Sequence, residues 1–314
     1  MTGRGSAPPP PGLEELARAA LVDALGTGVR IERVDPVQSA ETSTVLRLSL
    51  AAPPRHVVFK ATRRGAAEGT DYARTAAVVD LARAAGAPVA AVLASDTSER
   101  SAPWQYLLQE HVPGTEWRRV RPLLGADEVS AVHASIAEAV LAIQTVRFDG
   151  YGELDRRARP AGRTLLDAVR GRARGRIVDR RRRQVFLDLL EQHADLFCDR
   201  PGAATLCHDD LHHGNVVLDR RDGRWRVAGL LDWDKAWAGP AESDPARMGF
   251  WDDMTGPASW RTYRAAVPAE PGSEQRALIY QLLWCLEYDV ATARHATDTR
   301  TLLRRLGADP AAAG

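Results

Sequence analysis

The chain has 314 residues, a formal net charge of +1 and 45% hydrophobic residues, which is the composition of a soluble globular protein with one or two folded lobes. The near-neutral charge gives no global field for nucleic acid or an anionic membrane, and no apolar run is long enough to span a bilayer. Three scattered cysteines without a CxxC motif predict reduced thiols in a cytoplasmic protein. Residues 1–11 are rich in Gly and Pro and lack the apolar stretch of a signal peptide, so we predict a disordered tail there.

The first part of the chain predicts a small sheet with one inserted helix. Apolar residues at helical spacing indicate a helix over residues 12–25, which Gly26 ends, and an Ala-rich helix follows at residues 68–85. The predicted strands are short β-type runs at residues 30–37, 44–50, 56–62, 89–94 and 105–111. Pro113 and Gly114 then break the pattern.

The remainder of the chain is mainly helical in pattern. Helices are predicted at residues 127–146, 162–170, 174–197, 243–254, 259–267, 273–294 and 298–306. One short β pair, at residues 216–218 and 225–231, interrupts them. Residues 170–183 are dense in arginine, but no aromatic residues are interleaved, so we interpret this run as a solvated helix face and predict no nucleic acid partner.

The most informative stretch is residues 207–215, C-H-D-D-L-H-H-G-N, which is followed by the strand-ending Asp232. Phosphoryl transfer needs a carboxylate that orients the attacking hydroxyl, together with oxygen ligands for Mg²⁺. Asp210 can supply the first, and Asn215 and Asp232 can supply the second, because a hairpin of this length returns the chain beside the loop. We predict that His208 braces the loop through hydrogen bonds. Asp and Asn are common in turns, so the hypothesis depends on their joint spacing.

The same stretch leaves a metal-hydrolase hypothesis open, because His208, Asp210, His212 and His213 lie close together in sequence. Two histidines at i and i+4 can bind one metal when both lie on a helix. Gly214 and the Val-Val strand after it favour a loop instead, so we interpret His212 and His213 as packing groups.

Two upstream features fit a nucleotide site. Lys60 ends the strand at residues 57–60 and is the only lysine before the loop, which predicts that it contacts nucleotide phosphates. Residues 106–114 predict a strand that runs into a hinge, where the backbone of Glu110 to Val112 can hydrogen-bond an adenine edge. An ordinary interlobe linker would have the same pattern.

On these motifs the chain resembles the aminoglycoside phosphotransferase family, within the protein-kinase-like fold that includes choline and fructosamine kinases. The resemblance extends over about residues 30–295. Residues 207–215 resemble the family's C-H-G-D-L-H-P-G-N, and residues 229–234 resemble its I-D-W-E segment. Weaker similarities are the hinge at residues 107–114 and the F-x-G-x-G turn at residues 148–152. The family fold implies an α+β chain of two lobes, with a small antiparallel-sheet N-lobe at residues 12–112 and a mainly helical C-lobe at residues 113–314.

The resemblance also implies an activity, cofactors and site residues. It implies Mg²⁺-dependent transfer of the γ-phosphate of ATP or GTP to a hydroxyl of a small molecule, such as an aminoglycoside or related cationic antibiotic. By position it implies Asp210 as the catalytic base, Asn215 and Asp232 as metal ligands, Lys60 at the nucleotide phosphates, Glu110 and Val112 at the adenine, and His208 and Asp244 as structural support. A cationic acceptor calls for an acidic pocket, whose candidates are Asp234, Asp252, Asp253, Glu274, Glu287 and Asp289.

The chain departs from the family pattern at two places near the nucleotide. The segment at residues 38–44 has no glycine, so Ser43 and its neighbours are predicted to contact phosphate through hydroxyl groups. The helix glutamate that partners the strand lysine falls at Thr75, which leaves Asp71 or Glu68 as the expected substitute. These departures keep two alternatives open, a metabolic kinase of an amino alcohol or sugar and a nucleotide-binding pseudokinase.

Overall fold

The structure is a computed structural model that describes residues 9–39, 43–63, 70–100, 102–198, 204–288 and 292–311. Most of the predicted tail, part of the segment at residues 38–44, Glu68 and Asp289 lie outside the described residues. In the part of the chain that is described, no helix has the length and apolar character needed to cross a membrane.

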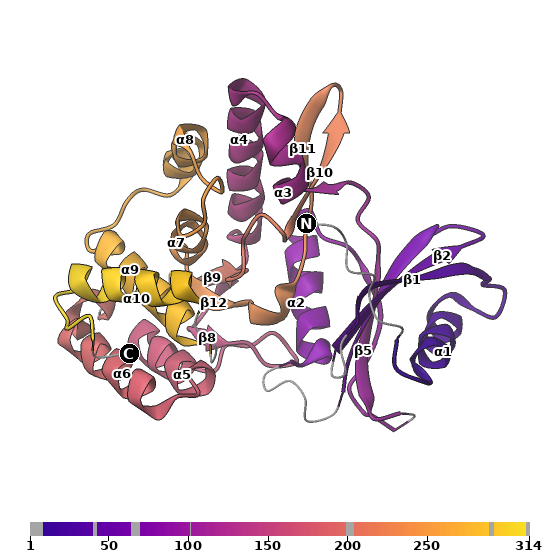
Figure 1. Cartoon of the computed structure of the whole chain (residues 1–314), viewed down its shortest axis with the longest axis horizontal. Coiled ribbons are helices and arrows are strands. Elements are labelled where there is room, and N and C mark those ends of the chain that lie inside the picture. The colour runs from indigo at the N-terminus through magenta and orange to yellow at the C-terminus, as the bar shows by residue number, and fades with distance from the viewer. Residues whose placement is uncertain are drawn as a thin grey trace.

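A five-stranded antiparallel sheet forms the N-terminal lobe (Figure 1). Its strands, in spatial order, are β1 (Ile31–Ser39), β2 (Ser43–Leu50), β3 (His56–Arg63), β5 (Trp104–Glu110) and β4 (Val92–Asp96). Alternate residues of β2 and β3, such as Leu46 and Phe59, are fully buried, as expected for strands with one covered face. They form a core with helix α1 (Leu13–Leu25), which lies on the outer side of the sheet in Figure 1. The predicted elements of this lobe are confirmed, with small shifts of their ends.

Helix α2 (Tyr72–Ala84) lies between the sheet and the rest of the molecule (Figure 1). It begins at Tyr72 rather than at residue 68, because the Asp71 side chain accepts hydrogen bonds from two amides of the first turn. Its buried Val78, Val79 and Ala82 belong to the large core of the C-terminal part and not to the core under α1. The helix therefore ties the sheet to the helical lobe.

The C-terminal part is mainly helical, as predicted. Its helices are α3 (Trp117–Val120), α4 (Ala126–Ile143), α5 (Leu165–Arg176), α6 (Arg180–Gln192), α7 (Ser243–Gly249), α8 (Pro257–Ala266), α9 (Ser273–Leu286) and α10 (Ala293–Arg305), with 3-10 turns η1 (Arg121–Leu123), η2 (Ala194–Phe197) and η3 (Trp233–Lys235).

Several predicted helix boundaries were wrong, and capping explains two of the differences. The break between α5 and α6 follows Arg176 instead of residue 170, because Asp179 accepts the amide of Arg182 and starts α6 there. The helix predicted at residues 273–294 ends at Leu286, and the next begins at Ala293 instead of residue 298, since Thr292 caps it by accepting the amide of His295. The predicted helix at residues 243–254 ends at Gly249.

Two small sheets cross the helical part, and the sequence predicted only one of them. The predicted pair is β10 (Val216–Arg221) and β11 (Arg224–Leu230), which β6 (Thr115–Glu116) extends. The other sheet has the order β7 (Arg147–Phe148), β9 (Ala204–Cys207), β12 (Trp237–Pro240) and β8 (Gly152–Glu153). All residues of β9 and β12 are buried, so neither strand has the alternating pattern by which a short strand is recognised.

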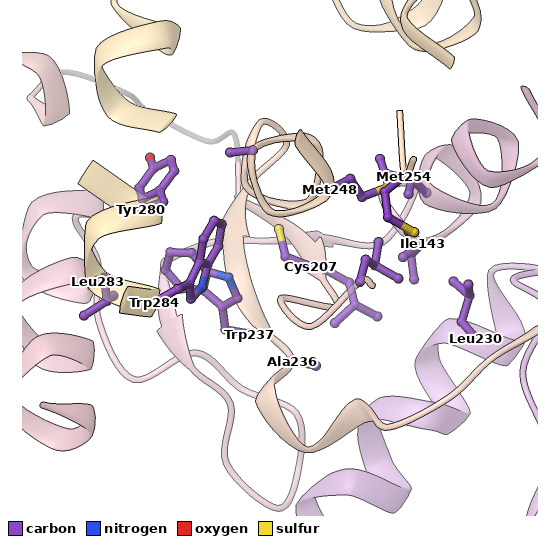
Figure 2. Close-up of a cluster of buried hydrophobic side chains, with 14 of the residues drawn as sticks. Ile143, Cys207, Leu230, Ala236, Trp237, Met248, Met254, Tyr280, Leu283 and Trp284 are labelled. Atoms are coloured by element: carbon purple, nitrogen blue, oxygen red, sulfur yellow. The ribbon is translucent and has the colours of Figure 1, made fainter. Parts of the chain in front are cut away.

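The unpredicted sheet lies inside the main hydrophobic core. Figure 2 shows Cys207 at the centre of this core, with Trp237 and Trp284 on one side and Met248 and Met254 on the other. Because β9 is held on both edges and covered on both faces, the chain leaves it at residue 208 in a fixed direction. The loop that follows, residues 208–215, carries the motif singled out from the sequence.

Gly114 permits a close approach of backbones where the N-terminal sheet connects to the helical part. It has φ +140°, and a β-carbon there would collide with the carbonyl of Leu218 and lie 2.8 Å from Val217 Cγ1. We expect Gly114→Ala to lower the free energy of unfolding by about 2–4 kcal/mol. Gly28→Ala is the control, because a β-carbon at Gly28 has no atom within 4 Å. Urea denaturation of both variants tests this, and equal stability of the two would contradict it.

Candidate active site

The backbone of loop 208–215 is held by one buried carboxylate and one imidazole. Asp244, on α7, accepts the amides of His208 at 3.0 Å and Asp209 at 2.8 Å. Burial raises the pKa of Asp244 to about 7. The Nδ1 of His208 accepts the amide of Asp210 at 3.3 Å, so its Nε2–H donates to the carbonyl of Leu231 at 2.9 Å. Burial lowers the pKa of His208, which favours the neutral ring that this pair of bonds requires.

The strand β11 returns beside this loop, as the hairpin length indicated. The amide of Leu231 donates to the carbonyl of Asn215 at 2.8 Å, and the side-chain amide of Asn215 donates to the carbonyl of Asp210 at 2.9 Å. That bond leaves the Asn215 side-chain oxygen for a ligand, with the Asp232 carboxylate one residue after Leu231. A carboxylate and an amide oxygen form the hard donor set that Mg²⁺ prefers, so these residues fit this ion.

The histidines of the loop do not form a metal site. The rings of His212 and His213 pack against Trp251, with centroids 5.6 and 5.7 Å away. Across the described residues, no group of three or more His, Cys, Asp or Glu side chains has an arrangement that could hold a metal ion. The metal-hydrolase hypothesis therefore finds no ligand set in this part of the chain.

Lys60 faces two carboxylates from the segment after β11. Its Nζ lies 2.8 Å from Asp232 and 3.3 Å from Asp234. Burial alone would lower the pKa of Lys60, but Asp234 and Asp232 outweigh it and raise the pKa, so the ammonium stays charged. The second carboxylate oxygen of Asp234 accepts the hydroxyl of Thr75 at 2.9 Å. Thr75, which stands where the family glutamate was expected, thus holds a carboxylate that comes from another part of the chain.

The predicted substitutes for the missing glutamate need correction. Asp71 does not reach Lys60, because its carboxylate caps α2 and pairs with Arg156 at 2.7 Å. Glu68 lies outside the described residues.

A narrow cavity between the two lobes begins at Lys60. Its polar end contains Lys60, Thr75 and Asp232, and its apolar walls include Val79, Val89, Ala90, Leu107, Leu230 and Trp233. Apolar walls beside a cation and a carboxylate are groups that a nucleotide site uses, but the cavity volume of about 20 Å³ is smaller than a nucleotide, so binding there requires the walls to separate. Ser43 begins β2 opposite Thr62, one strand away from this cavity.

The predicted hinge lies next to the cavity, but its backbone groups are not equivalent. The amide of Glu110 donates to Ala91 at 2.9 Å and the amide of His111 donates to His56 at 3.2 Å. Within the described ranges, Val112 is therefore the hinge residue whose amide has no such backbone acceptor. Its side chain packs over Gly229 of β11, where a β-carbon would approach within 2.7 Å.

The carboxylate of Asp210 pairs with Arg247, a residue that the sequence analysis missed. The two groups are 2.7 Å apart, and the Arg247 side chain is only 1% exposed. Burial would raise the pKa of Asp210, but Lys235 and Arg247 lower it below the ordinary value, so the carboxylate is ionised at neutral pH. Arg247 lies one helical turn after Asp244 on α7, and that spacing was the signal available in the sequence.

The arginine run at residues 170–183 is not wholly a solvated face, which corrects the sequence interpretation. Arg172 is buried and its guanidinium bridges Asp209 and Glu153 while it stacks over Trp237 at 4.0 Å. Arg176 lies 3.1 Å from Asp209 and 3.2 Å from Glu153. Asp209 has φ 64°, a left-handed conformation that aspartate tolerates. Helix α5 is thereby fixed to loop 208–215.

A second pocket of about 530 Å³ adjoins this arginine pair. Its lining includes Thr70, Arg74, Glu153, Arg172, Arg176, Asp234, Lys235, Glu287 and Tyr288. Two of the predicted acceptor carboxylates, Asp234 and Glu287, are in this lining. Asp252 instead lies 3.7 Å from Arg294, and Asp253 lies 3.0 Å from Arg121.

The comparisons with known proteins agree with this fold. The model of the phosphotransferase enzyme family matches residues 11–279, so the chain belongs to that family. No curated protein sequence matches the chain. The predicted family resemblance and the two-lobe α+β fold are both confirmed.

Solved structures of several kinases have a similar fold. Aminoglycoside phosphotransferase APH(4)-Ia has 19% identity and a TM-score of 0.66, with 96% of this chain and 99% of that chain covered. The streptomycin–ATP complex of APH(2")-IIa has 14% identity and a TM-score of 0.59, with 98% and 99% covered. Choline kinase from Cryptosporidium parvum has 10% identity and a TM-score of 0.59, with 93% and 95% covered. At these low sequence identities, the structural similarity shows that the fold is shared and says nothing about the substrate.

The buried pair of Arg172 and Asp209 should be strongly coupled, because removal of either partner strands a buried charge. In a double-mutant cycle with Arg172→Met and Asp209→Asn, we expect a coupling energy of about 1–3 kcal/mol. The control cycle uses Arg170, also on α5, and Glu191 of α6, whose side chains are 28% and 66% exposed; for this pair we expect less than about 0.5 kcal/mol. Chemical denaturation measures both cycles, and equal coupling would refute the tie between α5 and the loop.

Proposed function

We propose that the chain transfers the γ-phosphate of a purine nucleoside triphosphate, ATP or GTP, to a hydroxyl group of a small molecule in a Mg²⁺-dependent reaction. The proposal depends on the groups that meet near the cavity between the lobes. They are a carboxylate paired with cations, two oxygen donors that can bind a metal, and a lysine. Asp210, Asn215 and Asp232 come from neighbouring chain segments joined by hydrogen bonds, and Lys60 reaches Asp232 from the other lobe. These are the parts that phosphoryl transfer requires.

In this proposal the nucleotide lies in the narrow cavity, with its phosphates at Lys60. Asn215 and Asp232 hold Mg²⁺, which when bound neutralises charge on the phosphate oxygens. Val112 and the neighbouring Glu110 contact the adenine or guanine edge through the backbone, and Ser43 contacts phosphate. The ion pair between Lys60 and Asp232 supports these roles, because it holds both side chains at one end of the cavity in advance.

Asp210 orients the acceptor hydroxyl and takes its proton. Arg247 and Lys235 keep its carboxylate ionised, so it can accept a hydrogen bond from the hydroxyl at neutral pH. A carboxylate with a lowered pKa is a weak base, which suits a reaction in which the proton leaves late and positioning contributes most. The ionised Asp210, together with the candidate metal ligands Asn215 and Asp232, favours an active kinase over a pseudokinase.

Two classes of acceptor follow from the family. An aminoglycoside or related cationic antibiotic, with a role in resistance, is the candidate that the family resemblance supports. A metabolite with one positive charge or none, such as an amino alcohol or a sugar, is the candidate that the pocket beside α5 supports, since its carboxylates are already paired. The three free cysteines support a reducing, cytoplasmic location.

Removal of the Asp210 carboxylate should slow the chemical step without loss of nucleotide binding. We expect Asp210→Asn to lower kcat by about 10²–10⁴-fold, the scale of a positioned acid–base group, with unchanged affinity for the nucleotide. Asp232→Asn should instead weaken Mg²⁺-nucleotide binding, measured by calorimetry. Asp252→Asn is the control, because that carboxylate is 88% exposed. Near wild-type turnover of Asp210→Asn would remove this residue from the mechanism.

The role of Asp234 as a partner of Lys60 can be tested by moving the carboxylate from position 234 to position 75 on α2. Asp234→Ala should raise the KM for the nucleotide by about tenfold, because Lys60 loses one of its two carboxylates. Thr75→Glu in the Asp234→Ala background should recover most of that loss, since the new glutamate enters from the helix position that holds Asp234. Thr75→Ser, which keeps the hydroxyl, is the control. A double variant no better than Asp234→Ala would show that Asp234 acts in another way.

A further inference from the structure

We propose that the acceptor is an uncharged polyhydroxyl compound and that an arginine–carboxylate network in the pocket beside α5 selects against polycations. This inference rests on the proposed function, because it concerns the substrate that would reach Asp210. The pocket is next to that residue: Lys235 is in its lining and acts on the Asp210 carboxylate, and Arg172 and Arg176 contact the adjacent Asp209.

Cationic side chains outnumber carboxylates by one among the described residues that line the pocket. In its described lining, four cationic side chains (Arg74, Arg172, Arg176 and Lys235) face three carboxylates (Glu153, Asp234 and Glu287). A site for a polycation would show the opposite excess, with carboxylates that outnumber the cations.

Each of these carboxylates already has cationic or hydroxyl partners. Glu153 lies 2.9 Å from Arg172, 3.2 Å from Arg176 and 3.2 Å from Arg74. Despite burial, these arginines lower the pKa of Glu153, so it is ionised and neutralised in place.

The remaining two carboxylates are occupied in the same way. Glu287 lies 2.6 Å from Lys235 and 3.5 Å from Arg176, and Lys235 and Arg176 lower its pKa against the effect of burial. Asp234 is held by Thr75 and Lys60. An incoming ammonium group would have to displace a guanidinium or ammonium that is already there, and it would meet the repulsion of the other cations at close range.

A polyhydroxyl compound meets neither obstacle. A hydroxyl group donates and accepts, so it can bond to a carboxylate lone pair or a guanidinium N–H without changing the net charge of the network. Tyr288, whose ring stacks on His295 with centroids 4.6 Å apart, adds an aromatic group to the lining. The lining thus combines fixed donors, fixed acceptors and a ring.

The origin of the network is Asp209. The family motif has glycine at this position, and here the aspartate side chain points to α5 and binds Arg172 and Arg176 together. Those two arginines, together with Arg74, neutralise Glu153, and Arg176 also reaches Glu287. One departure from the motif therefore contributes to the pairing of two acidic groups in the pocket.

The test compares closely related acceptors, one of which carries ammonium groups where the other is neutral. The pairs are glucose with glucosamine, an inositol with the matching inosamine, and several aminoglycosides with their fully N-acetylated forms. Nucleoside diphosphate release gives kcat/KM for each, and calorimetry with Mg²⁺ and a non-hydrolysable ATP analogue gives binding that does not depend on turnover. We expect the neutral member of a pair to bind, and to be phosphorylated, at least about tenfold better.

The outcomes separate this inference from the proposed function. A tenfold preference for the cationic members, or no binding by any neutral member, overturns the inference even when phosphate transfer occurs. Binding of neutral members without phosphate transfer supports the inference and counts against the proposed function.

Two variants test the network itself. Arg176→Met releases Glu153 and Glu287 from one cation, so the preference should shift toward the cationic member by about tenfold. Arg170→Met is the control on the same helix, since Arg170 pairs with Asp167 and Glu191, which are not in the described lining. Lys235→Met, which releases Glu287 and also removes a cation that acts on Asp210, is the second variant if Arg176→Met does not fold, and its effect is measured as the binding preference in calorimetry. A preference that stays unchanged in the folded variant contradicts the proposal.

Discussion

The arrangement of the whole site depends on one buried carboxylate, Asp244. It is removed from water, and its two hydrogen bonds with the amides of loop 208–215 compensate part of that cost. Since both amides are fixed, Asp209 takes its left-handed conformation and directs its side chain to α5. Asp210, the next residue, then meets Arg247, which lies on the same helix as Asp244. Helix α7 thus holds the backbone of the loop and, together with Lys235, keeps its central carboxylate ionised.

The second constraint is that charges around this loop are buried in pairs. Arg172, Arg247 and Asp209 are at most 2% exposed at their side chains, and each has an oppositely charged partner. Such pairs add little stability, because desolvation offsets their attraction, but they have few alternative arrangements. The consequence is a stiff surface of paired charges beside Asp210, where an acceptor that relies on hydrogen bonds has an advantage over one that relies on charge.

Lys60 obtains its carboxylate partner from a different segment of the chain than the family pattern implies. A lysine in a partly buried cavity needs carboxylates nearby to remain charged. Where the family places a glutamate on the helix, this chain has Thr75, and the carboxylate comes from Asp234 after β11. The same segment also carries Asp232. The short segment after β11 therefore supplies both the candidate metal ligand Asp232 and the carboxylate of Asp234 that pairs with Lys60.

Elements with local signals could be predicted from the amino-acid sequence alone. Alternating apolar residues gave the N-terminal strands, helical spacing gave α1 and α4, and the spacing of Asp210, Asn215 and Asp232 identified the loop and the hairpin that returns to it. Only the tertiary structure decided which charges meet. Lys60 and Asp234 are 174 residues apart, and Arg172 and Asp209 are 37 apart. Strands β9 and β12 are buried on both faces and left no alternation in the sequence. Local pattern reports the conformation of neighbouring residues, whereas ion pairs and buried strands depend on which distant segments pack together.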